Sequence, residues 1–319
     1  MSYIDEVSKE LYSYLPPLTK REDFDEFWER TLGKTRSVPL NPRREIYDYP
    51  SPYAEVYDIS YNGFDDTRIH GWFLLPKFTG KTKLPCLIHY HGFTLNRGRP
   101  ANFMHWLALG VAVLSVDCRE QTGETGNSAR YSSGHAVNLA CKGIMDKDEF
   151  YYRAVYMDSV KAIDFALSQP EVDSGRIIIE GASQGGALGM AVCSLDHRPW
   201  LAMVDVPSNS NLEQRVAGAH GSFGSVAEYL KIYPDRVDKA FETLSYFDTM
   251  NMAERIKCPL LASVALKDNT CPALMYFASY NRITSPKEIR VYPFNGHEGG
   301  GDVHTEIKMR FLAEKLISS

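Results

Sequence analysis

A serine flanked by glycines is the strongest chemical signal in this sequence. Gly181-Ala182-Ser183-Gln184-Gly185 fits the pattern Gly-x-Ser-x-Gly, with an Ile-rich segment before it and a segment of small residues after it. A serine on a tight turn between a strand and a helix exposes its hydroxyl, and the helix N-terminus places free N–H groups beside it. We predict that Ser183 is a nucleophile for attack on a carbonyl carbon. The alternative is a glycine-rich turn that does no chemistry.

A nucleophilic serine needs a histidine as its base. In α/β-hydrolases, which carry this kind of turn, the chain order is Ser, then Asp or Glu, then His. His297 lies in a loop between the last predicted strand and the last predicted helix, where the base belongs, so we predict it as the general base. His304 is a weaker candidate because we expect it to begin or cap the final helix, and His197 and His220 follow no late strand.

The acid of the triad should follow an earlier strand. Asp268 directly follows a predicted strand, and one helix and one strand separate it from His297, so the two loops should lie side by side. Its carboxylate would hold the imidazole tautomer and stabilise the imidazolium without taking a proton. Asp205 and Asp248 are weaker candidates, and Asp268 could instead be a simple turn or helix-capping residue.

An oxyanion hole needs two converging N–H donors. The residue after the nucleophile, Gln184, should supply one backbone N–H, and Phe93, in the loop after an earlier strand, should supply the other. His89 and His91 could instead be read as a metal pair, but no carboxylate or cysteine cluster accompanies them in the sequence. We expect no metal and no cofactor.

The elements that must position these residues alternate between short apolar strands and helices. This alternation predicts an α/β fold with a mainly parallel sheet and helices on both faces. We predict strands at 55–61, 68–75, 86–90, 111–116, 176–180, 201–206, 260–266 and 289–292, and helices at 103–109, 152–167, 184–193, 273–280 and 305–317.

The chain should form a single domain over residues 1–319. Residues 1–50 read as an N-terminal extension that contains a packing helix, with capping-box spacing at Thr19 and Glu22. Residues from about 208 to 254 interrupt the alternation, and we expect a helical insertion over the active site there.

Composition excludes several classes of protein. The 319 residues include 40 acidic and 35 basic ones, which gives a net charge of -5 and disfavours a nucleic-acid partner. The first residues do not have the pattern of a signal peptide, and the longest apolar run, 107–116, is about half of the ~20 residues that span a membrane. The six cysteines form no Cys-x-x-Cys pair, which favours reduced, buried thiols. We expect a cytoplasmic protein without a membrane partner.

Taken together, these residues resemble carbohydrate esterase family seven, the acetyl xylan esterases and cephalosporin C deacetylases. The resemblance implies an α/β-hydrolase fold, Ser183, Asp268 and His297 as the triad, and the Phe93 and Gln184 N–H groups as oxyanion donors. The segments that carry it run nearly end to end, at 23–28, 68–72, 143–148, 151–153, 181–186, 244–248 and 296–298.

The resemblance also implies a function. A member of this family would be a serine esterase that removes acetyl groups from acetylated xylo-oligosaccharides and similar small acetyl esters, including the cephalosporin C type. It would form a homohexamer whose active sites face an inner cavity. A general short-chain carboxylesterase without sugar preference and a catalytically dead hydrolase fold that acts as a binding protein remain as alternatives.

Three positions depart from the family pattern. Glu120 stands where the family has Gly, which adds a charged side chain near the site. Phe93 replaces the usual Tyr and removes a phenol hydroxyl. Gly299-Gly300-Gly301 follows Gly296-His297-Glu298 where the family often has a bulky residue, so we expect a more mobile loop and a wider acyl pocket.

Overall fold

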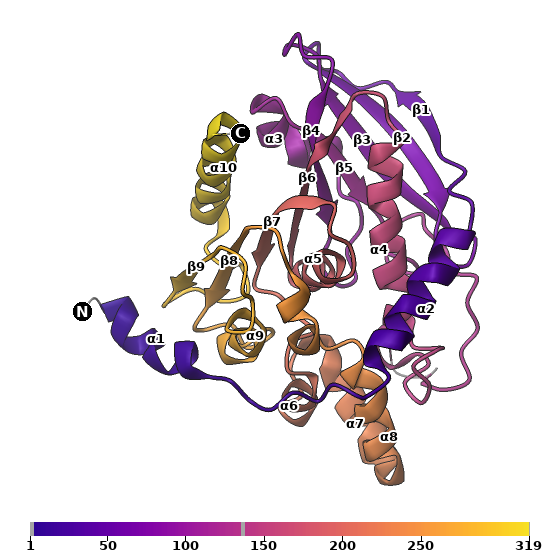
Figure 1. Cartoon of the computed structure of the whole chain (residues 1–319), viewed down its shortest axis with the longest axis vertical. Coiled ribbons are helices and arrows are strands. Elements are labelled where there is room, and N and C mark those ends of the chain that lie inside the picture. The colour runs from indigo at the N-terminus through magenta and orange to yellow at the C-terminus, as the bar shows by residue number, and fades with distance from the viewer. Residues whose placement is uncertain (1–2, 135–137, 319) are drawn as a thin grey trace.

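Nine strands form one sheet in the part of the chain that the structure, a computed structural model, describes: residues 3–134 and 138–318. The strand order is β1-β2-β3-β5-β4-β6-β7-β8-β9 (Figure 1). Neighbours from β1 to β5 are antiparallel and neighbours from β5 to β9 are parallel, which confirms the predicted mainly parallel sheet. The strands are β1 (Arg43–Tyr47), β2 (Ala54–Asn62), β3 (Arg68–Pro76), β4 (Leu84–Tyr90), β5 (Ala112–Val116), β6 (Val172–Ala182), β7 (Pro199–Asp205), β8 (Leu260–Ala265) and β9 (Lys287–Tyr292).

Helices cover both faces of the sheet, as predicted. In Figure 1, α3 and α10 lie on one face, and α4, α5 and α9 lie on the other. The helices are α1 (Tyr3–Ser13), α2 (Phe24–Ser37), α3 (Met104–Ala108), α4 (Tyr151–Leu167), α5 (Gln184–Leu195), α6 (Leu212–Ala217), α7 (Gly224–Ile232), α8 (Val237–Ser245), α9 (Ala273–Tyr280) and α10 (Gly301–Ser318).

The central strands are apolar on both sides because each side faces a packed core. Ile177 and Ile179 of β6 point into the larger cluster, which includes side chains of α4 and α5. Ile178 between them points into the second cluster, with Trp106 of α3 and Phe311 of α10. A strand buried on both faces reads as a continuous apolar run, which is why these strands were recognisable from sequence.

Two N-terminal elements were not predicted. The helix α1 is largely exposed and packs on α9, where the Asn281 side chain donates to the Leu11 and Tyr14 carbonyls at 2.9 Å. The edge strand β1 has an exposed, polar pattern that carries no strand signal. Helix α1 packs on an element far away in the sequence, whereas β1 pairs antiparallel with β2, the next strand along the chain.

The predicted capping box at Thr19 and Glu22 is wrong. Helix α2 begins at Phe24, later than that spacing implies. The Thr19 hydroxyl accepts a hydrogen bond from the Asn251 side chain at 2.9 Å, and the Thr19 N–H donates to Asn251 Oδ1 at 3.2 Å. Thr19 therefore ties the N-terminal segment to residues that follow α8.

The segment 208–254 contains α6, α7 and α8, which gather at one end of the molecule (Figure 1).

All six cysteines are buried and free, as predicted. Within residues 3–134 and 138–318, no helix combines the length and the apolar character that crossing a bilayer requires.

A buried ion cluster joins β6, β7 and α10. Lys308 Nζ donates to Glu180 Oε1 and to Asp205 Oδ2, each at 2.6 Å. His304 Nε2 lies 2.8 Å from Asp205 Oδ1, to which Ser263 Oγ also donates. Burial alone would raise the pKa of the Glu180 and Asp205 carboxyls, but the Lys308 cation holds both pKa values below their usual range. The cluster fixes the last helix against the carboxyl ends of two central strands.

Replacing Lys308 by Met keeps most of the buried volume but leaves two buried carboxylates without their cation. We expect Lys308→Met to lower the free energy of unfolding at pH 7 by about 3–5 kcal/mol. The measurement is denaturant unfolding of Lys308→Met beside Arg310→Ala, which removes an exposed pair with Glu306 on the same helix and should change stability by about 0.5 kcal/mol or less. Equal effects of the two changes would contradict the role given to the cluster.

Candidate active site

Ser183 occupies the turn between β6 and α5 in a conformation that is rare for a residue with a side chain. Its backbone has φ 58° and ψ −118°. The turn is held from β7, because the Ser183 N–H donates to the Asp205 carbonyl at 2.9 Å and its carbonyl accepts from the Ser208 N–H at 3.0 Å. These bonds stabilise the strained turn and fix the position of the hydroxyl.

The glycines of the Gly-x-Ser-x-Gly motif are required by close backbone contact. A Cβ on Gly185 would lie 1.8 Å from the Tyr90 carbonyl oxygen, and one on Gly181 would lie 2.6 Å from the Gly185 carbonyl carbon. Either would force the start of α5 away from β4 and β6. The motif therefore encodes a close approach of strand and helix, as its sequence context indicated.

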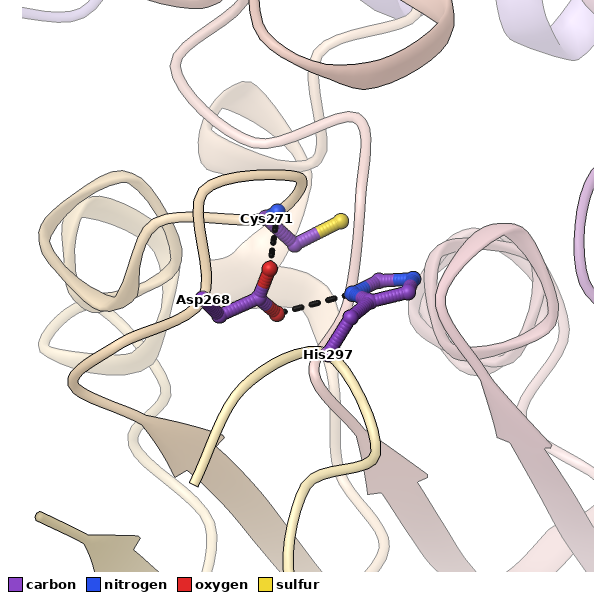
Figure 2. A group of neighbouring side chains, drawn as sticks. All are labelled: Asp268, Cys271 and His297. Carbon is purple, nitrogen blue, oxygen red and sulfur yellow. Dashed lines mark hydrogen bonds and ion pairs between the residues drawn. The ribbon is translucent and has the colours of Figure 1, made fainter. Parts of the chain in front are cut away.

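The structure brings Ser183, His297 and Asp268 into one hydrogen-bonded chain. His297 Nε2 lies 3.0 Å from Ser183 Oγ. His297 Nδ1 lies 2.8 Å from Asp268 Oδ2, the contact that Figure 2 shows. Asp268 follows β8 and His297 follows β9, so the three side chains meet at the carboxyl edge of the sheet. This is the geometry of a nucleophile, its base and the acid that orients the base.

The Asp268 carboxylate is buried and fully engaged. Its Oδ1 accepts from the backbone N–H groups of Thr270 and Cys271, each at 2.8 Å, while its Oδ2 faces His297. Burial alone would raise the pKa of Asp268, but His297 and these amides hold it below its usual value. An ionised carboxylate at this position favours the His297 tautomer with a proton on Nδ1.

The weaker candidates lie elsewhere. His304 sits within the first turn of α10, which begins at Gly301 and not at residue 305, and its Nδ1 lies 2.9 Å from Tyr292 Oη. Asp205 belongs to the Lys308 cluster. Asp248 accepts three backbone N–H groups, from Asn211, Leu212 and Met250, and burial raises its pKa to about 6.

His197 and His220, the two other late histidines, do not contact Ser183. His197 is exposed on the surface. His220 Nδ1 lies 3.0 Å from the Asn269 carbonyl oxygen, in the loop that carries Asp268.

Gln121 links the two predicted oxyanion donors, a role that the sequence analysis missed. Its Oε1 accepts a hydrogen bond at 2.7 Å from the backbone N–H of Thr94, the residue directly after Phe93. Its Nε2 donates to Gln184 Oε1 at 3.0 Å and to the Tyr151 hydroxyl at 3.1 Å. Its position next to Glu120, one of the three departures from the family pattern, was the available signal. The side chain of Gln121 braces both loops that carry the predicted donors.

A cavity of about 720 Å³ opens at Ser183, within the range of small-molecule sites. Two groups of lining residues differ in chemistry. The Arg215 group consists of Arg215, Gly221, Ser222, Thr270 and Cys271. The His89 group consists of His89, Asn102, Phe103, His105, Trp106 and Thr305.

Asp268, Cys271 and His297 are the one cluster among the described residues with metal-ligand spacing (Figure 2). The donors are already used, because Asp268 holds His297 and two backbone N–H groups. Burial raises the pKa of the Cys271 thiol and so favours its protonated form, and the Arg215 cation lies beside its sulfur. The arrangement fits a hydrogen-bonded triad better than a cation site.

The two histidines considered as a metal pair have separate partners. His91 Nε2 accepts from the Cys118 N–H at 2.8 Å, and His91 Nδ1 lies 2.8 Å from the Gly92 carbonyl oxygen. His89 Nδ1 lies 2.6 Å from Glu180 Oε2. Both ring nitrogens of His91 are therefore engaged with backbone groups.

Glu120, the first family departure, does not line the cavity. It has φ 57°, a conformation that glycine, the residue of the family pattern, adopts at little cost, and its carboxylate accepts hydrogen bonds from Lys142 and Asn127. Burial opposes its ionisation, but these two donors hold the pKa of Glu120 below its usual value.

Gly299, Gly300 and Gly301 are not among the residues that line the cavity. All three have positive φ. A Cβ on Gly299 would lie 2.9 Å from Val206, and one on Gly300 would lie 2.4 Å from the Tyr292 ring. Glycine at these two positions allows the chain to pack closely between His297 and α10.

A mostly parallel sheet with Ser, Asp and His in that chain order at its carboxyl edge defines the α/β-hydrolase fold class, as predicted. The family described as acetyl xylan esterase (AXE1) matches residues 1–315. The chain belongs to this family, which places it among the carboxylic ester hydrolases.

Two solved structures and a further relative agree with this family. An acetyl xylan esterase from Paenibacillus sp. R4 is 38% identical, with a TM-score of 0.92 over 99% of each chain. Acetyl xylan esterase 1 from Thermoanaerobacterium sp. JW/SL YS485 is 30% identical, with a TM-score of 0.88 over 95% of this chain and 98% of that one. An acetyl esterase of Xylanibacter ruminicola is 28% identical over 295 residues, and the match covers 89% of this chain but 65% of that relative's length.

Removing the Gln121 amide should misplace both predicted oxyanion donors without touching the nucleophile. We expect Gln121→Ala to lower kcat for 4-nitrophenyl acetate on the order of tenfold to a hundredfold with little change in KM, somewhat less than the loss of a donor itself. Steady-state kinetics beside the exposed Gln214→Ala, which should behave as wild type, provide the check. A change confined to KM would show that Gln121 does not position the donors.

Burial makes His91 a source of acid sensitivity. Its pKa is lowered to about 4 by burial, whereas an unfolded histidine titrates near 6.5. Between these two pKa values, the unfolded chain therefore binds more protons than the folded one. The contribution of His91 to the free energy of unfolding is full above about pH 6.5 and is lost as the pH falls towards 4. Lowering the pH from 7 to 5 should therefore reduce the free energy of unfolding by about 2 kcal/mol through His91.

Denaturant unfolding at both pH values, with wild type, His91→Gln and the exposed His197→Gln, measures this contribution. Only His91→Gln should lose the extra pH dependence, whatever its absolute stability. The opposite effect of Asp248, whose pKa is about 6, cancels because all three proteins share it. Equal pH dependence in the three proteins would contradict the assignment.

Proposed function

We propose that this protein is a serine esterase that removes acetyl groups from small hydroxylated substrates through an acetyl-Ser183 intermediate. The observation that supports this most directly is the continuous hydrogen-bonded chain from Asp268 through His297 to Ser183 at the cavity. Family membership supports the acetyl group as the acyl part.

In this mechanism, His297 Nε2 takes the proton of Ser183 as Oγ attacks the acetyl carbonyl carbon. The backbone N–H groups of Phe93 and Gln184, neither of which donates to another group among the described residues, would hold the resulting oxyanion. Collapse expels the alkoxide, which takes the proton from His297. Water then attacks the acetyl-enzyme with His297 again as base, and acetate leaves.

The substrate class that we propose is acetylated xylo-oligosaccharides and similar small sugar acetates. The His89 group combines aromatic rings with amide, hydroxyl and imidazole groups, a mixture suited to the apolar faces and hydroxyls of a sugar. The names of the Paenibacillus and Thermoanaerobacterium relatives point to acetylated xylan as well. A cavity of about 720 Å³ suits a short oligosaccharide and not a polymer chain in full.

Acetate release from acetylated xylo-oligosaccharides tests the proposal. Wild type should release acetate, and Ser183→Ala should lose activity by at least a thousandfold because the nucleophile is gone. Ser194→Ala is the matched control and should keep activity. Ser194 lies on α5, the helix that follows Ser183, and its hydroxyl donates to the Met190 carbonyl. Acetate release that survives in Ser183→Ala would refute the mechanism.

A second comparison separates sugar deacetylation from general esterase activity. Equal kcat/KM for 4-nitrophenyl acetate and 4-nitrophenyl butyrate, without release from sugar acetates, would favour the general short-chain carboxylesterase. The homohexamer, the cytoplasmic location and the division into extension, domain and insertion stay predictions.

A further inference from the structure

Arg215 is a buried cation at the active-site cavity, and no carboxylate among the described residues forms an ion pair with it. Its side chain is 1% exposed, yet it lines the cavity. Nη2 donates to the Thr270 carbonyl at 2.9 Å and lies 3.6 Å from Cys271 Sγ. Nε and Nη1 have no hydrogen-bond partner among the described residues. A buried guanidinium in this state is costly unless an anion or another acceptor completes it.

The other buried arginines in the described residues behave differently. Each of them pairs with a carboxylate, which is the usual solution for a buried charge. The pairs are Arg97 with Asp58 at 2.9 Å, Arg119 with Asp158 at 2.7 Å, and Arg153 with Asp148 at 2.9 Å. The cavity wall also contains Lys308, whose ammonium group pairs with the carboxylates of Glu180 and Asp205. Arg215 therefore stands apart from the other buried arginines of the described residues.

The position of Arg215 is fixed by its surroundings. It lies on α6, whose first N–H groups are held by the Asp248 carboxylate. The Phe223 ring lies 5.8 Å from the guanidinium carbon, and Gly221 allows the chain to pass so close that a Cβ there would lie 3.1 Å from Nη2. A cation held this firmly can select a ligand by charge and shape.

The guanidinium is also close to the reacting oxygen. Cys271 Sγ, which contacts Arg215 Nη2, lies 4.0 Å from Ser183 Oγ. A group bound at Arg215 would therefore be separated from the ester carbonyl by the width of one side chain. A carboxylate two or three carbons from that carbonyl spans such a gap.

We propose that Arg215 forms a carboxylate subsite in the cavity, so that the enzyme favours esters that also carry a carboxylate near the ester carbonyl. A carboxylate suits the planar guanidinium, and a single negative charge matches the single unpaired cation. The carboxylate could belong to the acyl part or to the alcohol part of the ester. The inference rests on the proposed function, because it concerns the substrate of the same site.

Two pairs of esters distinguish these sources. For the acyl side, mono-4-nitrophenyl succinate is compared with 4-nitrophenyl methyl succinate, which is neutral. For the alcohol side, O-acetylglycolate is compared with O-acetylglycolamide. In each pair, the ratio of kcat/KM for the charged ester to that for the neutral one is measured in wild type and variants, so differences in chemical reactivity cancel between proteins.

In at least one pair, we expect Arg215→Gln to lower this ratio tenfold or more, and Arg215→Lys to keep part of the preference because the charge remains. Arg236→Gln, on the same 208–254 segment but at the surface beside Tyr233, should leave the ratio unchanged. A ratio that stays within twofold of wild type in Arg215→Gln for both pairs would overturn the proposal. Arg215 would then only brace the Thr270 loop, with Nε and Nη1 hydrated.

A measurement on wild type covers the case in which Arg215→Gln does not fold. Propionate should inhibit 4-nitrophenyl acetate hydrolysis at least tenfold more tightly than propionamide, and added salt should weaken that inhibition. Equal inhibition by the acid and the amide would overturn the proposal. If wild type hydrolysed no acetyl ester at all, the proposed function itself would be contradicted. Normal acetyl esterase activity without a preference for carboxylates would contradict this inference alone.

Discussion

The structure depends on one close contact, the approach of the turn at Ser183 to the end of β4. Gly185 lies so near the Tyr90 carbonyl that no side chain fits there. Because of this contact, α5 begins directly at Ser183 with the positive end of its dipole, and the loop after β4, which carries Phe93, lines the same cavity as Ser183. A larger residue at Gly185 would therefore disturb the nucleophile and both predicted oxyanion donors at once.

Charge compensation fixes the rest of the site around this turn. Asp268 is held by His297 and by backbone N–H groups, and the Glu180 and Asp205 carboxylates share the Lys308 cation. These carboxylates stay ionised although they are buried, because each has a cation or fixed donors at hydrogen-bond distance. The carboxyl ends of β6, which precedes Ser183, and of β7 are thereby tied to α10.

Local sequence patterns predicted the parts of the fold that local physics determines. Buried strands, the strand–serine–helix turn and the chain order of Ser183, Asp268 and His297 all leave patterns in sequence, and the structure contains each of them. Thr19 was misjudged because its partner, Asn251, is distant in sequence, and no pattern marks a hydrogen bond of that kind. Gln121 was overlooked as a brace for the same reason.

Arg215 was the hardest feature to predict, because its importance lies in the lack of a hydrogen-bond acceptor for Nε and Nη1 among the described residues. An arginine on a short polar helix normally reads as a solvated surface residue, whereas here Phe223 and Gly221 pack close to the buried guanidinium. The cavity wall therefore combines compensated charge at Lys308 with uncompensated charge at Arg215. Such an asymmetry would orient the carboxylate-bearing ester proposed above, since its carboxylate would be attracted to Arg215 and not to the compensated charge at Lys308.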